Sequence, residues 1–514
     1  MPDLRDLLAA TATQAADYRE RTDELPVFPT VNLEDVRAAH GSLRDGPTAA
    51  STVIDELVQI IEPALVATTG PRYFGFVTGG ALDAATAADM LATGWDQNAF
   101  NAVTSPGAAL VEDVAGAWLK DLLGLPAHAS FGFVTGGQGA NIVSLAAARH
   151  HVLANAGWDV ERDGLPASPK VRVIANGERH ATIDMALRFL GFGTGALEPV
   201  ASDPQGAIDV EDLVHVLDSA PPGPAIVCLQ AGNVNTGAFD DFTTAIKVAH
   251  DRGAWVHVDG AFGLWAAANP ATRHLVTGVE LADSWATDGH KWLNVPYDSG
   301  YAFCAYPEAH AAATSYSAVY LRDRGEGELR TPGDFVLESS RRARGFATWA
   351  ALRQLGHSDL AELIERCYVL ARRFAEQLAP IEDITILNDV VLNQVLVRFR
   401  DDDNETDRVI QAIPRSGECW MGATTWRGAR AMRISVSNWR TTETDVDRSI
   451  NAILGAIWSG STLFTSQQLI DSLARVRPSN DLLFPRSQFK HVTVGASKPN
   501  SAHAQRWTLV QPTV

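Results

Sequence analysis

The stretch Ser284–Trp292 reads SWATDGHKW, and its lysine, Lys291, is the residue that best indicates the fold and chemistry of this chain. Upstream, the apolar run Trp255–Val258 ends on a single carboxylate, Asp259. A lysine in apolar surroundings at a strand end can be neutral enough to form a Schiff base. An aspartate at the end of a buried strand can hold a heterocyclic nitrogen protonated. Either residue alone is more often a surface charge, but together they outline a site for pyridoxal 5'-phosphate (PLP).

Composition sets the class of protein. The chain has 514 residues, 46% of them hydrophobic, which is enough for a large core and two or more domains. Its formal net charge of -19 argues against a nucleic-acid partner, because no basic surface offsets the acidic excess. An acidic enzyme is therefore predicted.

Cysteine usage and hydropathy predict the compartment. The four cysteines have no CxxC spacing, so neither a disulfide framework nor a metal site is expected. No segment has the uninterrupted apolar length of a membrane span, and the N-terminus carries charges instead of an apolar signal. A cytoplasmic protein with no membrane partner is predicted. The cysteines are Cys228, Cys304, Cys367 and Cys419.

Short apolar runs alternate with longer helical stretches from Phe131 onward. The predicted strands are Phe131–Val134, Val171–Ala175, Ala225–Leu229 and Trp255–Val258, with two more near Ser284 and Tyr301, and the helices are Ala140–Asn155, Ala181–Leu190 and Thr243–Arg252. This alternation predicts an α/β domain with a mostly parallel sheet and helices on both faces. Ligands of such sheets bind at the carboxyl ends of the strands.

Four regions are predicted along the chain. Residues 1–75 form a helical arm, 76–312 the large domain, 313–460 a smaller α+β domain and 461–514 a tail with no clear periodicity. The arm is broken by prolines and holds an amphipathic piece, Ser51–Leu65; the charged, glycine-containing segment Arg322–Gly333 is predicted to be a mobile loop. The small domain is predicted to contain helices Leu360–Leu378, Thr406–Ile413 and Glu443–Ile457 and strands Val391–Phe399 and Met432–Val436.

A glycine-rich turn follows the first predicted strand. The sequence FVTGGQGAN, starting at Phe133, leads into a helix, so backbone N–H groups around Gly137 and Gln138 would converge on an anion such as a phosphate. The same residues could equally make an ordinary tight connection. His180 opens another helix, where it could stack on a cofactor ring or simply cap the helix. Asp288 and His290, beside the lysine, could reach the same phosphate.

Six motifs together resemble the PLP-dependent group II amino acid decarboxylases, which have the fold-type I, aspartate aminotransferase-like architecture. The resemblance spans roughly Pro71 to Ile457. It predicts a large domain with a mostly parallel, seven-stranded type of sheet and a smaller C-terminal α+β domain. The motifs are GFVTGGQGAN, ERHATIDMALRFLG, GAFDDF, WVHVDGAFG, ADSWATDGHKWLNVPYDSG and SSRRARGFATWAALRQLG.

The resemblance also implies roles for individual residues. It implies that Lys291 binds PLP covalently, that Asp259 pairs with the pyridine nitrogen, that His180 stacks on the ring and that Ala261 packs on its other face. The implied phosphate-binding residues are Gly137, Gln138, Asp288 and His290. Enzymes of this fold bind PLP at a subunit interface, so a homodimer with composite sites is expected, with Arg322–Gly333 reaching the partner.

Three departures from the family pattern bear on the reaction. The stretch Gly232–Gly237 lacks the usual threonine pair, for which Asn235 or Thr236 could substitute, and Gln138 stands where serine or threonine is usual. The segment Arg330–Phe335 lacks the tyrosine that protonates the carbanion in aromatic amino acid decarboxylases. Tyr316, Tyr320, His180 or a water could replace it. Without that donor, related enzymes can divert the carbanion to oxygen and form aldehydes.

Substrate contacts are suggested at three positions. Thr78 and Phe100 lie in segments that match the family's substrate pocket, although aromatic residues there could equally be core. Arg433 could clamp the substrate carboxylate or make a structural ion pair. The predicted function is PLP-dependent decarboxylation of an L-amino acid, aromatic or bulky in preference to acidic. The alternatives are an aldehyde synthase or aminotransferase and, in another class, a non-catalytic protein with this fold.

Overall fold

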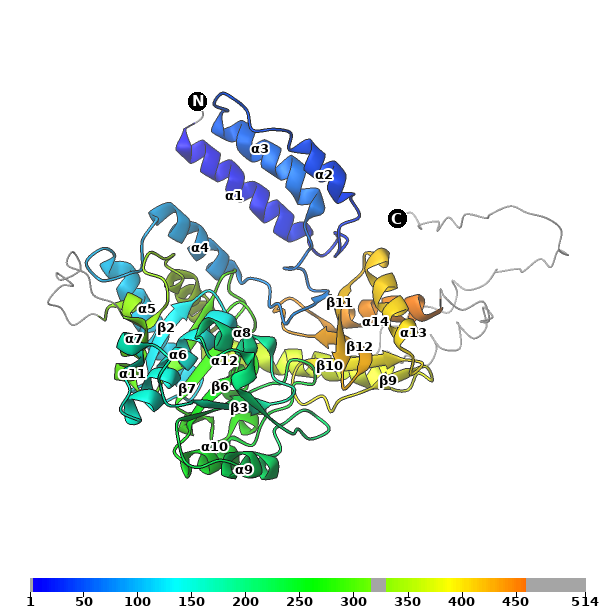
Figure 1. The fold of residues 1–514 in the computed structure, drawn as a ribbon. Helices are drawn as coiled ribbons and strands as arrows, with labels where there is room; N and C mark the ends of the chain where they lie inside the picture. The colour runs from blue at the N-terminus through cyan, green and yellow to red at the C-terminus, as the bar shows by residue number, and fades with distance from the viewer. Residues whose placement is uncertain (1–2, 316–329, 459–514) are drawn as a thin grey trace, which may run out of the picture. The chain divides into compact units, whose positions relative to one another are not determined.

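The computed structural model describes residues 3–315 and 330–458 (Figure 1). These belong to one compact unit, Met1–Ser461. Tyr316, Tyr320, the part of the predicted loop before Arg330 and the predicted tail lie outside the described residues. The predicted boundaries between arm, large domain and small domain stay predictions.

A seven-stranded sheet organises the large domain. Its strands, in spatial order, are β2 (Ser130–Val134), β8 (Gly300–Cys304), β7 (Ser284–Asp288), β6 (Trp255–Asp259), β5 (Ala225–Gln230), β3 (Arg172–Asn176) and β4 (Leu197–Val200). Strand β8 runs antiparallel to both neighbours, and the pairs from β7 to β4 are parallel. The mostly parallel sheet and the predicted α/β fold are therefore confirmed. Strand β4, with the sequence LEPV, was not predicted because its apolar residues do not form a continuous run.

Strand register brings the chemically interesting residues to one edge of this sheet. Asp259 at the end of β6 lies opposite Ala286 of β7, and Asp288 ends β7 opposite Gly300 of β8. Because β6 and β7 are parallel, both carboxylates emerge at the carboxyl ends of their strands.

Helices pack around the sheet. Helix α6 (Gly137–Asn155) begins directly after β2 and contacts β5, β6, β7 and β8, while α8 (Ala181–Phe189) and α11 (Pro307–Thr314) pack beside it. The buried run Ala146–Ala148 lets α6 approach its neighbours closely. Helix α10 (Phe242–His250) packs on β6 and lies beside α9 (Val210–Asp218), as Figure 1 also shows.

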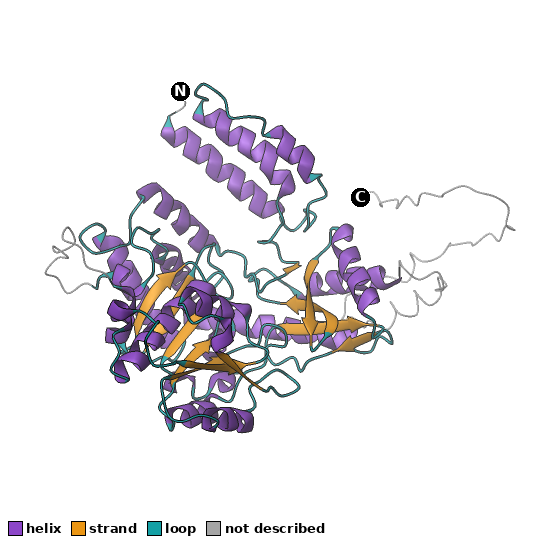
Figure 2. Cartoon of the chain, viewed as in Figure 1, coloured by secondary structure: helices purple, strands orange, loops and turns teal. Residues whose placement is uncertain are grey.

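A second, five-stranded sheet forms most of the smaller region. Its order is β1 (Tyr73–Phe74), β11 (Trp420–Trp426), β12 (Ala429–Ser435), β10 (Gln394–Phe399) and β9 (Ile384–Ile386). Only the β1–β11 pair is parallel. Figure 2 shows its strands gathered apart from those of the large sheet. Strand β1 comes from the end of the predicted arm, so a local sequence reading could not connect it with strands so distant along the chain.

Helices α12 (Gly345–Leu378), α13 (Asp403–Ala412) and α14 (Glu443–Trp458) complete this region. Helix α12 consists of two helical pieces separated by Gly356, whose φ of 57° is not helical; the second piece contains the predicted Leu360–Leu378, and the first, which begins at Gly345, was not predicted. Helix α13 starts at Asp403, since the Asp402 side chain accepts from Glu405 N and caps it. Strand β10 begins at Gln394, later than the predicted Val391.

The N-terminal region is helical, as expected. It contains α1 (Leu4–Arg21), α2 (Leu33–Ala39) and α3 (Ala50–Ile61). Helices α4 (Asp83–Trp95) and α5 (Pro106–Leu122), which the sequence reading missed, both pack against α12. The short helix η7 (Pro332–Phe335) precedes α12 along the chain. In the part of the chain that the structure describes, no helix combines the length and apolarity that crossing a bilayer requires.

The end of the predicted mobile loop is packed. The Arg330 guanidinium lies 3.8 Å from the Phe131 ring centroid and 4.7 Å from that of Phe335, and Pro332 and Gly333 are buried. This part of Arg322–Gly333 therefore differs from the expected loop, because stacking on two aromatic rings offsets the exposure that its charge suggested.

Candidate active site

The glycine-rich turn forms a narrow cradle at the start of α6. Gly137 N donates to Asp288 Oδ1. A Cβ added to Gly137 would lie 2.9 Å from Asp288 Oδ2, and one added to Gly136 would lie 3.0 Å from His290 Cε1. The turn therefore admits only glycine without movement of these neighbours. Together with the N-terminus of a 19-residue helix, it suits an anion such as a phosphate.

Asp288 and His290 both reach this cradle but differ in what they can do there. His290 Nε2 lies 3.4 Å from Asp288 Oδ1, and burial lowers the pKa of His290. A neutral imidazole can donate one hydrogen bond to a phosphate. An ionised carboxylate only accepts, so Asp288 would compete with a phosphate for Gly137 N. Gln138 is exposed at the helix start.

Lys291 lies just beyond the end of β7. Its Nζ is 3.2 Å from Asp288 Oδ2 and 5.9 Å from the centroid of the Phe262 ring, and its side chain is 19% exposed. A Cβ on Gly79 would collide with Lys291 O, so the segment around Gly79 packs directly on the lysine backbone. The amine is thus held at a sheltered strand end beside a carboxylate.

Asp259 ends β6 with both oxygens engaged. Its Oδ1 accepts from Ala261 N at 3.2 Å, and its Oδ2 accepts from Asn141 Nδ2 at 3.0 Å. The residue is 6% exposed. The two N–H donors leave further lone pairs on the carboxylate, which can accept a hydrogen bond from a protonated ligand nitrogen. Ala261 also lies near the glycine cradle, because a Cβ on Gly137 would be 3.5 Å from Ala261 Cβ.

His180 fills one of the two roles that the sequence left open, because it caps the helix that it precedes. Its Nδ1 accepts from Thr182 N at 3.3 Å, so the ring caps α8. Desolvation lowers the pKa of His180; the charge of Asp259 opposes this shift and that of Lys291 adds to it. The ring is therefore within the electrostatic reach of both residues. Stacking on a cofactor stays a prediction.

Two of the predicted substrate residues lie in the same region. Thr78 is buried, and its Oγ1 lies 3.3 Å from the hydroxyl of Tyr297, whose ring stacks on His290 at 4.3 Å between centroids. Arg433 Nη1 donates to Val234 O at 3.0 Å, and burial lowers the pKa of Arg433. Within residues 3–315 and 330–458 it makes no ion pair, so the alternative of a structural ion pair is not observed there.

Phe100 lies in another set of contacts. Its carbonyl oxygen accepts from Gly333 N at 2.8 Å, and its ring packs so tightly on Gly333 that a Cβ there would lie 2.5 Å from Phe100 Cδ2. Phe100 is thereby attached to η7, and its place in a substrate pocket stays a prediction.

The residues proposed to replace the missing threonine pair are engaged elsewhere. Thr236 Oγ1 donates to Gln205 O at 2.6 Å and accepts from Ala238 N at 3.2 Å. Asn235 Oδ1 accepts from Thr424 Oγ1 at 2.7 Å. These bonds stabilise the turn and its contact with β11, and they engage the Thr236 hydroxyl and the Asn235 amide oxygen.

Sequence reasoning missed Tyr297 and Asn141. Tyr297 follows the lysine motif closely in sequence and is 62% exposed, whereas Asn141 sits one turn into α6 and is fully buried. The available signal was their position in the sequence, because Tyr297 follows the DGHKW motif closely and Asn141 ends the GGQGAN turn. Neither signal says which way a side chain points.

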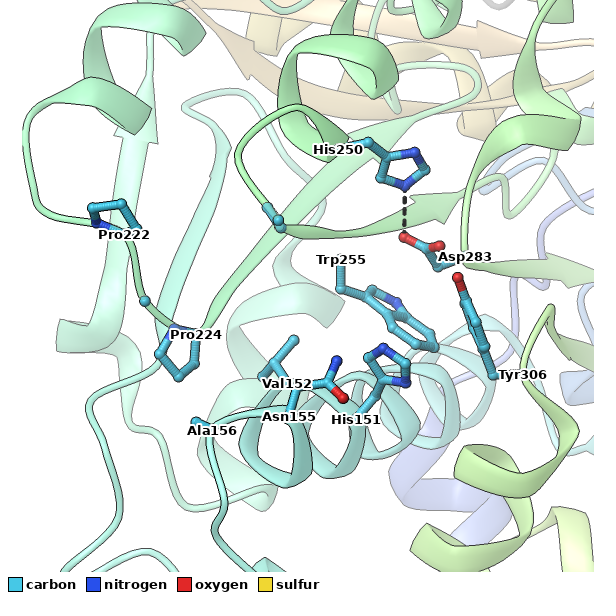
Figure 3. Close-up of a pocket in the computed structure, with 13 residues that line it drawn as sticks. His151, Val152, Asn155, Ala156, Pro222, Pro224, His250, Trp255, Asp283 and Tyr306 are labelled. Carbon is cyan, nitrogen blue, oxygen red and sulfur yellow. Dashed lines mark hydrogen bonds and ion pairs between the residues drawn. The ribbon is translucent and has the colours of Figure 1, made fainter.

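A separate pocket of about 560 Å³ lies at the opposite edge of the sheet, near the amino ends of β5, β6 and β7. Figure 3 shows His250 pointing at Asp283, with Nε2 3.0 Å from Oδ2. Asp283 Oδ2 also accepts from Val256 N at 2.6 Å. The rings of His151, Trp255 and Tyr306 pack together with centroids 4.7 to 5.2 Å apart. The lining includes no lysine, so this pocket lacks the amine present near Asp288.

Comparison with known proteins identifies the family. Residues 34–400 match the pyridoxal-dependent decarboxylase conserved domain. The chain is 27% identical to phenylacetaldehyde synthase of Rosa hybrid cultivar over 470 residues, covering 85% of this chain and 90% of that protein. It is also 27% identical to aromatic-L-amino-acid decarboxylase of Bacillus atrophaeus over 386 residues, covering 72% and 78%.

The fold agrees with this assignment. The crystal structure of Oryza sativa TDC with PLP and tryptamine superposes with a TM-score of 0.82 at 23% identity, covering 89% of this chain and 98% of that one. The chain belongs to the pyridoxal-dependent decarboxylase family. It is a PLP-dependent carboxy-lyase that acts on an L-amino acid.

Proposed function

We propose that this carboxy-lyase acts on an aromatic or similarly bulky L-amino acid and holds PLP through Lys291. The observation that carries the proposal is the convergence of Lys291, Asp259 and the glycine cradle at one edge of the sheet. The substrate class is supported by relatives named for aromatic substrates, tryptophan and tyrosine decarboxylases among them.

The residues around the cradle fit the cofactor. Gly137 N, the start of α6 and His290 would hold its phosphate, with Gln138 at the rim, and Asp259 would accept a hydrogen bond from the ring nitrogen. His180 and Ala261 would lie on the two faces of the ring. Asp288 is better suited to orienting Lys291 Nζ, at 3.2 Å, than to contacting a phosphate. Bound PLP supplies an electron sink for the electron pair of the bond to the lost carboxylate.

The chain's own groups would do the remaining work. Arg433 and Thr78 are proposed to bind the substrate carboxylate, and Phe100 to contribute to the pocket. Lys291 Nζ would move protons as substrate replaces it and as product leaves. Asp259, oriented by its two N–H donors, would keep the ring nitrogen protonated throughout.

Aldehyde formation is a second candidate. The segment Arg330–Phe335 carries no tyrosine, and a relative at 27% identity is a phenylacetaldehyde synthase. If no protein group delivers a proton to the substrate carbon quickly, oxygen can react with that carbon in place of the proton. His180 and Tyr297 are the candidate donors near the described site, the latter through its hydroxyl beside Thr78.

We further propose a cytoplasmic homodimer with composite sites. Helices α1, α2 and α3 contain no buried residue, and several of their apolar side chains are exposed, which suits packing against a partner. The exposed residues include Leu4, Leu8, Leu33, Val53 and Leu57. All four cysteines are free and buried, in keeping with a reducing compartment.

The proposed function is tested by incubating the purified protein with PLP and a panel of aromatic, aliphatic and acidic L-amino acids in air. Carbon dioxide, amine, aldehyde and hydrogen peroxide are measured together. Amine and carbon dioxide in equal amounts from aromatic substrates support the proposal. Turnover confined to acidic substrates would contradict the substrate class, and peroxide with aldehyde would favour the second candidate.

A further inference from the structure

A buried row of hydrogen bonds leads from Asp259 into the layer between α6 and the sheet. Asn141 Nδ2 donates to Asp259 Oδ2 at 3.0 Å, and Asn141 Oδ1 lies 2.9 Å from His257 Nε2. His257 Nδ1 lies 3.0 Å from Ser284 Oγ, which accepts from Trp255 Nε1 at 3.0 Å. Three elements, α6, β6 and β7, contribute to this network.

The network is enclosed by the core. Asn141, His257 and Ser284 are all 0% exposed, and Trp255 is 3% exposed. Trp255, His257 and Asp259 alternate along β6 and therefore face the same side of the sheet. Burying polar side chains costs free energy unless each is hydrogen-bonded, and apolar residues would fill this space at less cost. The presence of the polar residues Asn141, His257 and Ser284 so close to Asp259 indicates a role beyond packing.

The two ends of the network fix the direction of every proton in it. An ionised Asp259 can only accept, so Asn141 turns its amide N–H toward it and its oxygen toward His257. His257 Nε2 must then carry the proton, which leaves Nδ1 to accept from the Ser284 hydroxyl. At the far end the Trp255 indole can only donate, and it fills the acceptor side of Ser284. Each donor therefore points toward Asp259.

The same amide connects to a second candidate cofactor contact. Asn141 Nδ2 also lies 3.0 Å from Thr182 Oγ1, which is 2.8 Å from His180 Nδ1. Burial lowers the pKa of His257 to about 4, so the imidazole in the network stays neutral at physiological pH. A neutral His257 ring orients the Asn141 amide, and through it Asp259, without adding a positive charge to the network.

We propose that Asn141, His257 and Ser284 are positioning residues that keep the Asp259 carboxylate correctly oriented toward the ring nitrogen of PLP. The inference rests on the proposed function, since it assigns a purpose to the carboxylate that contacts the cofactor. None of the three touches the reacting atoms; they act through Asp259, whose other oxygen is held by Ala261 N.

Two matched pairs of variants test the network in the holoenzyme. Ser284→Ala removes its hydroxyl, and Ser144→Ala is the control, because Ser144 is equally buried on α6 but donates to Trp285 O at 3.4 Å outside the network. His257→Leu removes the imidazole, and His257→Gln retains an amide donor that can reach Asn141 Oδ1. The visible absorption of the bound cofactor is titrated against pH, and kcat and KM are measured.

Ser284→Ala and His257→Leu are expected to lower kcat by about tenfold to a hundredfold, as loss of an outer partner of a functional group does, with KM little changed. The midpoint of the absorption titration should move in both, and His257→Gln should restore it. Should His257→Leu fail to fold, Ser284→Ala against Ser144→Ala decides alone. Identical titrations and kcat in those two serine variants would overturn the proposal. A wild-type protein that binds no PLP would overturn the proposed function instead, and with it this role.

Discussion

The two edges of the large sheet hold similar residues and yet differ in chemistry. Both edges carry an aspartate, a histidine and aromatic rings. At the carboxyl edge, burial lowers the pKa of His180, and Lys291 adds an amine. At the amino edge, Asp283 raises the pKa of His250 and also binds Val256 N. A pocket with ionisable groups is thus not a reactive site unless an amine, an anion cradle and an accepting carboxylate meet there.

The largest effect is expected from Asp259→Asn. The amide cannot stabilise a protonated ring nitrogen, so turnover should fall by about two orders of magnitude or more while most of the cofactor remains bound. Steady-state kinetics and the absorbance of the purified variant measure both quantities. Near-normal turnover would mean that this carboxylate is structural.

Gly137→Ala should weaken the cradle itself. Its Cβ would lie 2.9 Å from Asp288 Oδ2, so the turn must shift, and the Kd for PLP should rise by about tenfold through weakened hydrogen bonds at the helix start. Gly455→Ala is the control, since nothing lies within 4 Å of its added Cβ. Equal PLP affinity in the two variants would mean that the glycine cradle does not bind the phosphate of PLP.

A smaller effect is expected from Pro332→Tyr, which puts a phenol into the segment lacking the family's tyrosine. If wild-type turnover in air releases peroxide, this variant should lower the peroxide released per carbon dioxide by about twofold or more, through faster proton delivery. Because Pro332 is buried in η7, thermal unfolding must first show that the variant is folded. A wild-type protein that yields only amine and carbon dioxide would show that another group already protonates the substrate carbon.

The smallest effect is expected at the amino edge, from His250→Gln. Asp283 raises the pKa of His250 in the folded protein, so this pair stabilises the fold below the unfolded pKa, about 6.5, and the gain is lost as pH rises through the folded pKa. Since the imidazole is partly exposed, the loss of stability in His250→Gln should stay below about 1 kcal/mol at pH 5.5 and vanish at pH 8.5. Thermal unfolding at both pH values measures it, with kcat expected to be unchanged. A large fall in kcat would instead show that the amino edge contributes to turnover.

Local patterns in the sequence predicted the sheet and the edge at which the candidate site residues meet. The run Trp255–Val258 and the motif around Lys291 are periodic or compositionally unusual, so they identified β6, β7 and the residues at their ends. Strand β1 was missed because it pairs with β11, far along the chain. The first piece of α12, from Gly345 to the non-helical Gly356, was also missed.

Side-chain partners could not be predicted in the same way. The packing of α6 and the loops decides these partners. Asn141 donates a hydrogen bond to Asp259, and the Thr236 hydroxyl donates one to Gln205 O. The packed state of Arg330 likewise depends on two aromatic rings from distant segments. Composition alone predicted a loop there, because charged residues and glycine are typical of loops and composition does not reveal a stacking partner.

Covalent attachment of the cofactor at Lys291 is the central claim, and one measurement tests it directly. The protein incubated with PLP should absorb near ~420 nm, as a lysine-bound PLP does, and borohydride should fix the cofactor irreversibly. Mass spectrometry of a digest should then find the reduced adduct on the peptide containing Lys291, and Lys291→Ala should show none. An adduct on another lysine, or equal trapping in Lys291→Ala, would contradict the account.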